Sequence, residues 1–389
     1  MTQSSTIATG AMPRALIAIV AANTVIVATE FIVVGLLPIL ARDLKISPAA
    51  AGHLVGVFAL SAALFGPPLT VAAGRLPSPR ILIGALLLFA ATDLAAVLWP
   101  QFSTIAAMRI LQGAALPVFI SVGAATVTEL AAPERQGRAL ALANTGFAAG
   151  LVIALPAGVA LARSGVWTPS FVALAVASLL AALLLIAIFP DARSTALPHV
   201  ARAIDLLRSP AFSLHLLLSV AVFTAMFAAY SYISVWLAEI AGLNNGAIAL
   251  ALAGFGAAGL VGNTMAAGIA DQAPLRATVV AVTVLAFAVF GLSLVTAPAP
   301  RIALFLLWGI AHTACVALCQ VRVTFAGRPA PAFAMAMNIS AANLGIALGA
   351  AAGGWMIGHH GINAIGWSSL AVLPAVAILA LAANWRTQF

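Results

Sequence analysis

Residues 15–40 read ALIAIVAANTVIVATEFIVVGLLPIL, an apolar segment that contains a single ionisable side chain, Glu30. About 20 apolar residues are enough for a helix to cross the hydrocarbon core of a bilayer, so this segment predicts a transmembrane helix. A charged side chain at the centre of such a helix costs about 2.5–3.5 kcal/mol on insertion scales, and intramembrane acids therefore generally mark functional sites. Glu30 is the first candidate functional residue.

The whole chain has the composition of a membrane protein. Of its 389 residues, 64% are hydrophobic and only 7% are charged, against roughly 25% charged in soluble domains. The net charge of +8 would suggest a nucleic-acid partner in a soluble protein, but here Lys and Arg are scattered between apolar segments, and we expect no such partner. Cys315 and Cys319 lack metal-ligand spacing, so we expect no metal site.

Twelve segments are long and apolar enough to cross a bilayer. They cover residues 14–38, 49–74, 79–98, 101–124, 138–162, 168–189, 210–237, 246–270, 276–297, 301–323, 331–355 and 363–384. The polar segment 190–209 separates an N-terminal half, 1–189, from a C-terminal half, 210–389, and we expect it to be a cytoplasmic linker.

The two halves resemble each other in sequence. GPPLTVAAGRLPSPR (66–80) and GNTMAAGIADQAPLR (262–276) are related by an offset of 196 residues, and GLVIALPAG (150–158) and GIALGAAAG (345–353) by 195. Chance matching of Gly and Ala is the alternative explanation. We predict an all-α membrane protein of twelve transmembrane helices, arranged as two pseudo-symmetric six-helix bundles with a substrate site between them.

Lys and Arg are distributed unevenly about the predicted spans. If both termini lie in the cytoplasm, twelve of these residues fall on the cytoplasmic side and four on the outer side. This excess follows the positive-inside rule. We therefore predict a multi-pass protein of a bacterial-type inner membrane with both termini in the cytoplasm.

Three motifs resemble those of known transporters. TEFIVVGLLPIL (29–40) resembles the first-helix signature of sugar-efflux and chloramphenicol-efflux transporters. RILQGAALP (109–117) is similar to a fourth-helix motif, and GFAAGLVIALPAG (146–158) to a fifth-helix antiporter motif. Together they resemble the drug:proton antiporter-1 family of the major facilitator superfamily. The resemblance covers essentially the whole chain and implies the major facilitator fold, with the first and fourth helices lining a central cavity.

The loop after the second helix departs from that family. It reads AAGRLPSPR (72–80) and lacks the usual acid, whereas the corresponding loop of the second half contains Asp271. Glycines four residues apart allow close helix approach and would also let the two halves rock against each other, while Pro156 should bend the fifth helix. The predicted conformational residues are Arg75, Arg80, Gly146, Gly150, Pro156, Asp271 and Arg276.

Proton coupling is predicted for Glu30, with Arg109 as the cation that tunes it. Glu30 lies roughly 24 Å along the first helix and Arg109 roughly 12 Å along the antiparallel fourth helix, so both reach a similar depth. Burial disfavours the ionised form of Glu30, and an approaching Arg109 favours it. A change in the distance between the two side chains would therefore make Glu30 bind or release a proton. A static structural pair is the alternative. Asp93 lies near the outer Trp99, within reach of water, and is either interfacial or a secondary proton site.

Candidate substrate contacts are aromatic or neutral polar side chains. Aromatic residues on the seventh and tenth helices recur at helical spacing, which is also typical of simple packing. A buried His beside a non-interfacial Trp suits a pocket with apolar walls and a few polar groups. Arg109 is the only deep cation that we expect, which argues against polyanionic substrates. The predicted substrate contacts are Asn23, Gln112, Asn144, Phe227, Tyr230, Trp308, His312 and Asn338.

These observations favour a proton-coupled antiporter that exports small neutral or lipophilic compounds such as drugs or sugars by alternating access. A proton-coupled uptake symporter is the alternative. The chain has no HExxH or GxSxG motif and therefore no visible machinery of a metal or serine enzyme. We expect no cofactor other than the proton gradient as energy source. The expected partners are protons, a small-molecule substrate and the lipid bilayer, in a monomeric protein.

Overall fold

A computed structural model describes residues 4–73, 76–132, 135–162, 164–190, 205–270 and 272–386. All secondary structure in these ranges is helical. The helices are α1 (Ser4–Asp43), α2 (Pro48–Ala73), α3 (Ser78–Leu98), α4 (Phe102–Leu130), α5 (Gln136–Ala149), η2 (Gly150–Ala154), α6 (Leu155–Leu161), α7 (Thr168–Ile188), α9 (Pro210–Tyr230), α10 (Ile233–Glu239), α11 (Asn245–Ala270), α12 (Pro274–Leu294), α13 (Pro298–Ala326), α14 (Pro331–His360), η3 (Ile362–Ala364), α15 (Ile365–Leu370) and α16 (Leu373–Arg386).

The predicted fold class is confirmed. Twelve helical segments of the described chain are long and apolar enough to cross a membrane, and each corresponds to one predicted span. The spans 138–162, 210–237 and 363–384 are each built from consecutive shorter helices. Several helices extend beyond the predicted limits, because hydropathy detects only the apolar part of a helix and not its polar ends.

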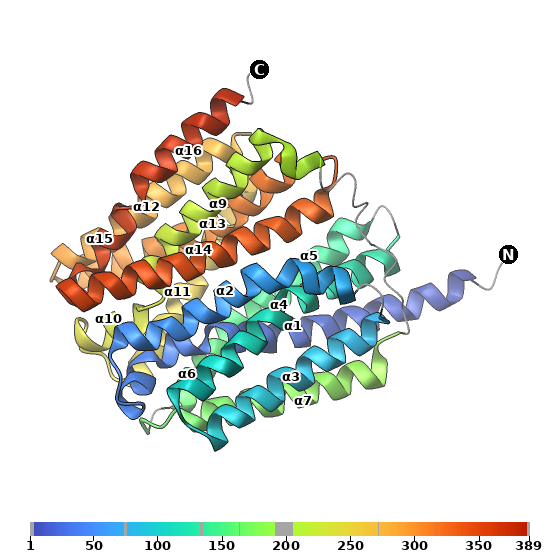
Figure 1. Ribbon diagram of the computed structural model, residues 1–389, viewed down its shortest axis with the longest axis horizontal. Helices are drawn as coiled ribbons and strands as arrows, with labels where there is room; N and C mark the ends of the chain where they lie inside the picture. Colours follow the sequence, from blue (N-terminus) through green and yellow to red (C-terminus); the bar gives the residue numbers. More distant parts are fainter. Residues whose placement is uncertain are drawn as a thin grey trace.

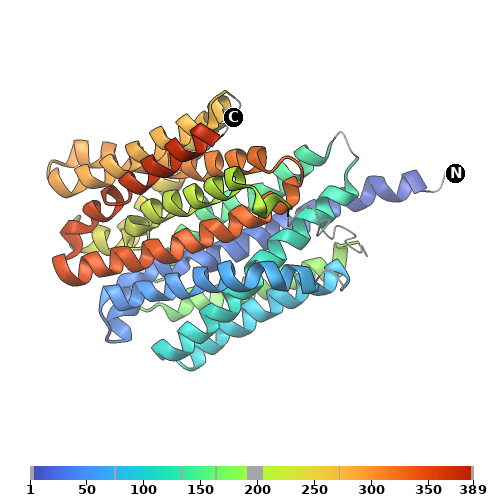
Figure 2. The ribbon, with the colours of Figure 1, turned by 45° about the horizontal axis from the view of Figure 1, so that its top comes forward.

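The helices form two bundles that lie side by side (Figure 1). In the first, α1 packs on α5 and α7, and α2 on α4; in the second, α9 packs on α14 and α16, and α11 on α13. The bundles meet where α2 contacts α14, α6 contacts α11 and α1 contacts α10. Turning the molecule keeps the blue-to-green helices on one side and the yellow-to-red helices on the other (Figure 2). The predicted linker 190–209 lies mostly outside the described residues.

The fifth span is interrupted at its middle. Gly150–Ala154 form a π-helical turn, and α6 begins directly after it with Pro156 in its first turn. The N–H of Leu155 donates to the carbonyl oxygen of Gly150, a bond one residue wider than in an α-helix. Pro156 has no N–H to donate, and a π-turn is one of the known ways for a helix to change direction around such a gap. The predicted irregularity therefore lies at this point.

Glycines hold the fifth helix of each bundle against the first. A Cβ atom on Gly146 would lie 2.7 Å from the Cβ of Asn23 on α1. In the second bundle, a Cβ on Gly345 would lie 2.6 Å from the carbonyl oxygen of Val220 on α9. The prediction that these seams lie between the rocking halves is thus wrong, because the contacts form inside each bundle. The glycines of the two bundles lie at equivalent positions, and this supports the internal repeat of about 195 residues seen in the sequence.

Candidate functional site

Arg109 on α4 is the centre of a buried polar network in the first bundle. Its side chain is only 2% exposed. The guanidinium donates to the main-chain oxygens of Thr29 at 2.9 Å and Glu30 at 2.6 Å, and its Nε donates to that of Leu54 at 3.4 Å. The guanidinium carbon lies 4.0 Å from the centre of the Phe58 ring, a cation–π distance. Arg109 thereby ties α4 to both α1 and α2.

Gln112 connects this arginine to Asp93 on α3. The side-chain oxygen of Gln112 accepts a bond from Arg109 at 3.1 Å, while its amide nitrogen donates to Thr92 Oγ1 at 2.9 Å and to Asp93 Oδ1 at 2.8 Å. Asp93 is 0% exposed, and its Oδ2 has no hydrogen-bond partner in the described part of the chain. The prediction that Asp93 lies within reach of water is therefore wrong. The carboxyl group is fully buried on a helix, α3, that packs against α4 and α7.

Glu30 lies at the depth that the sequence predicts, since the guanidinium of Arg109 reaches its carbonyl oxygen. Its side chain is only partly buried. Within the described ranges no ion pair joins the Glu30 carboxylate to Arg109; the sole ion pair found there links Arg42 to Asp43. Glu30 and Arg109 therefore meet through the main chain, and the Glu30 carboxylate is not paired with the guanidinium.

The residue after Glu30 joins an aromatic cluster that crosses the boundary between the bundles. The Phe31 ring lies 6.0 Å from Phe227 and 6.2 Å from Tyr230, both on α9. Tyr230 lies 4.5 Å from the ring of His312 on α13 and 5.4 Å from Phe255 on α11. We call this set the aromatic cluster; it consists of Phe31, Phe223, Phe227, Tyr230, Phe255, Phe305, Trp308 and His312.

Two buried polar atoms of the aromatic cluster have no hydrogen-bond partner in the parts of the chain that the structure describes. They are Nε1 of Trp308, on a side chain that is 2% exposed, and Nδ1 of His312, on one that is 8% exposed. Buried polar groups are normally paired. The cavity beside Trp308 measures about 10 Å³, whereas pockets for drug-sized ligands occupy roughly 300–1,000 Å³. A ligand would therefore need the bundles to separate before it could reach these atoms.

The structure brings Tyr230, Phe227, Trp308 and His312 together as the sequence suggests, but it places the three asparagines elsewhere. Asn23 donates to the carbonyl oxygen of Ala143 on α5 at 2.9 Å. Asn338 accepts from Ser219 at 2.9 Å, about three helical turns from Tyr230 along α9. Asn144 is half-buried on α5. The amides of Asn23 and Asn338 thus connect helices inside their own bundles.

A second buried arginine corrects the expectation of a single deep cation. Arg322 on α13 is 1% exposed; its guanidinium lies 2.9 Å from Nδ1 of His215 and donates to Ser219 Oγ at 2.9 Å. The predicted tenth span ends at residue 323, next to Arg322, whereas α13 continues to Ala326. Because it lies so close to the predicted end of the span, Arg322 was expected at the membrane surface and not in the protein interior.

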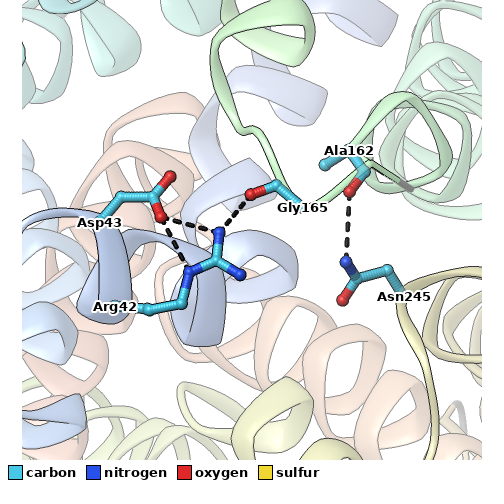
Figure 3. A network of polar contacts seen from close by, with 5 residues as sticks. All are labelled: Arg42, Asp43, Ala162, Gly165 and Asn245. Carbon is cyan, nitrogen blue, oxygen red and sulfur yellow. Dashed lines mark hydrogen bonds and ion pairs between the residues drawn. The ribbon is translucent and has the colours of Figure 1, made fainter.

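Of the predicted gating residues, Arg75 and Asp271 lie outside the described residues, and Arg80 and Arg276 are exposed near the starts of α3 and α12. Contacts between the bundles occur instead at the predicted outer end. Asn245 at the start of α11 donates to the carbonyl oxygen of Ala162 at 3.2 Å (Figure 3). Ser234 on α10 donates to the carbonyl oxygen of Val34 on α1.

The loop after α6 is also fastened to α1 at this end. Figure 3 shows Arg42 between the carboxylate of Asp43, at 2.7 Å, and the carbonyl oxygen of Gly165. The bundles are therefore in contact at the predicted outer end. Neither Ser234 nor Asn245 could be recognised from the sequence, since each contact depends on the packing of distant helices.

An apolar groove of about 360 Å³ lies between α2, α3 and α4. Its lining consists of aliphatic residues and Gly84. Without a polar side chain it has nothing to orient a ligand, and none of its lining residues belongs to the aromatic cluster. We do not assign the substrate site to it.

Comparison with known proteins places these features in a family context. The family model described as Major Facilitator Superfamily matches residues 19–326. A chloramphenicol resistance protein of Streptomyces lividans is 30% identical over 376 residues, which cover 95% of each chain. The crystal structure of a bacterial homolog of the human lysosomal transporter Spinster, in an inward-facing and occupied conformation, has a TM-score of 0.78 at 16% identity and covers 96% of each chain. That of a D-xylose-proton symporter has a TM-score of 0.74 at 16% identity, covering 95% of this chain and 97% of the symporter.

Proposed function

Because the chain belongs to the major facilitator superfamily of secondary transporters, we propose that it is a proton-coupled antiporter that exports small neutral or lipophilic compounds. It is a multi-pass membrane transporter and not an enzyme. The observation that carries the proposal is the position of Glu30, a partly exposed acid beside Phe31, where the aromatic cluster crosses from one bundle to the other. Proton and substrate would thus act on the same boundary.

The surroundings of Glu30 suit reversible protonation. Arg109 is close enough to favour the ionised carboxylate, yet its donors are engaged by main-chain oxygens and Gln112. A carboxylate that is held near a cation without being locked to it changes its proton affinity when the cation moves by a small distance. Rocking of the bundles would move α1 relative to the second bundle and open Glu30 to one side of the membrane at a time.

The aromatic cluster suits a neutral substrate with an aromatic ring. Its rings offer apolar walls, while the Trp308 N–H and the free nitrogen of His312 offer hydrogen bonds that nothing in the cluster uses. The Streptomyces lividans relative is named for resistance to chloramphenicol, a neutral aromatic compound. We propose chloramphenicol as the first substrate to test, in a protein with both termini on the cytoplasmic side of an inner membrane.

Flux in sealed proteoliposomes tests this proposal. With an imposed pH gradient, the wild type should move chloramphenicol saturably and against the direction of proton flow. Glu30→Gln should lose the gradient dependence, whereas Glu239→Gln, which changes an exposed acid at the end of α10, should keep it. Co-directional movement of chloramphenicol and protons would indicate a symporter instead. Absence of saturable flux for chloramphenicol and for a panel of sugars and lipophilic drugs would refute the proposal.

A further inference from the structure

The buried network of the first bundle contains two acids and one cation. Glu30, Asp93 and Arg109 are connected through Gln112 and the main chain of α1. If both carboxylates were ionised, the network would carry a net negative charge in a region of low dielectric. Such a charge is far more costly than a neutral acid, and buried groups usually avoid it by binding a proton. One proton therefore balances the network.

The contacts of Asp93 identify it as the holder of that proton in this conformation. Its Oδ1 accepts one bond from a neutral amide, and its Oδ2 has no partner in the described chain. No arginine or lysine lies within ion-pair distance of it among the described residues. A fully buried carboxylate with a single hydrogen bond would be poorly solvated when ionised. Glu30 is only partly buried, so its ionised form is less costly than that of Asp93.

The helices around Asp93 bring no other charge to it. Within Thr168–Ile188, α7 has no ionisable side chain. On α4 the ionisable residues are Arg109 and Glu129, and Glu129 lies about 30 Å further along the helix. On α1 and α3 the remaining ionisable residues, each at least 12 residues along its helix from Glu30 or Asp93, are Arg14, Arg42, Asp43 and Arg80. Asp93 therefore responds to Arg109 and Glu30.

Gln112 can connect Arg109 with Asp93 in only one orientation of its side-chain amide. A guanidinium has only donors, so the amide oxygen of Gln112 must face Arg109 and its NH₂ group must face Thr92 and Asp93. A displacement of Arg109 is then passed to Asp93 through a rigid planar amide. Among the described residues, this is the hydrogen-bonded route that connects the guanidinium with the carboxyl group of α3.

We propose that Glu30 and Asp93 share one exchangeable proton, with Arg109 and Gln112 between them, and that Asp93 holds it while the outer end is closed. When the bundles move, the O–H bond at Asp93 breaks and one forms at the Glu30 carboxylate, directly or through water, so the total charge is unchanged. The link to export rests on the proposed antiport function. The sharing itself does not, because it follows from the charges and contacts of the network.

Infrared spectroscopy of the reconstituted protein tests the sharing without any substrate. A protonated carboxyl group has a C=O absorption distinct from that of a carboxylate. The wild type at neutral pH should show such a band, and Asp93→Asn should lose it while keeping the acceptor oxygen for Gln112. Glu30→Gln should lose it as well, because Asp93 then becomes the only acid available to balance Arg109. Thr92→Val, which removes a Gln112 contact but no carboxyl, should retain the band.

Two results would overturn the proposal. A band that persists in Asp93→Asn would place the proton elsewhere, and a band that persists in Glu30→Gln would show that the two acids titrate independently. If Asp93→Asn fails to elute as a folded protein, Glu30→Gln still decides the question of sharing. Chloramphenicol flux in the same vesicles tests antiport separately. A shared proton without pH-driven flux would refute the proposed function and leave the sharing intact.

Discussion

Replacement of Arg109 by lysine keeps the buried charge but removes its forked geometry. The guanidinium bonds to three main-chain oxygens on two helices and to Gln112. A lysine has three donors at one point and cannot reach α1, α2 and Gln112 together. At least two charge-assisted bonds should be lost, each contributing about 1.5–3 kcal/mol, so the variant should be destabilised by about 3–6 kcal/mol.

Arg42→Lys is the matched control. Arg42 is 63% exposed and pairs with Asp43 at the outer end of α1, and exposed ion pairs contribute at most about 1 kcal/mol. Thermal denaturation of both purified variants in one detergent should therefore show a large loss of stability for Arg109→Lys and almost none for Arg42→Lys. Equal stability of the two variants would refute the argument that the fork of Arg109 holds the first bundle together.

Three further predictions follow from close contacts. Trp308→Phe keeps an aromatic ring but removes the unpartnered N–H. The KM for chloramphenicol should therefore rise about tenfold, equivalent to roughly 1.4 kcal/mol, with expression unchanged. An unaltered KM would exclude a hydrogen bond from chloramphenicol to this N–H. Gly113→Ala should lower thermal stability by about 1–3 kcal/mol because its Cβ would collide with the Phe58 carbonyl group, whereas Gly84→Ala, with nothing within 4 Å, should not lower it. Asn245→Leu removes the bond to the first bundle, and spectroscopic distance measurements across the outer end should show a larger open population than in the wild type.

The spans and the fold class could be predicted from sequence because hydropathy is a local property. Each apolar segment of about 20 residues must be a helix in lipid, whatever its neighbours are. The aromatic cluster was only half predicted. Spacing along α9 and α13 indicated Tyr230 and His312, but Phe31 and Phe255 come from other helices, and only the packing of the two bundles brings them in.

Buried charges were the least predictable feature, since their burial depends on which helix covers them. Asp93 lies close to the end of its span, and the sequence suggested contact with water, but it is fully buried on a helix that packs against α4 and α7. Arg322 lies near a predicted boundary that the longer helix α13 moves outward. In both cases distance along one helix was a poor guide to exposure, because a neighbouring helix supplies the cover.

In the proposed mechanism, chloramphenicol and a proton exchange at the boundary formed by Glu30 and the aromatic cluster. The most direct measurement is the proton release that follows addition of chloramphenicol to the purified transporter in weakly buffered detergent solution. Wild-type protein should release protons saturably, and Glu30→Gln should release none while Glu239→Gln behaves as the wild type. Equal release by the wild type and Glu30→Gln would rule out Glu30 as the exchange site, because the exchanged proton would then come from a group other than the acid at this boundary.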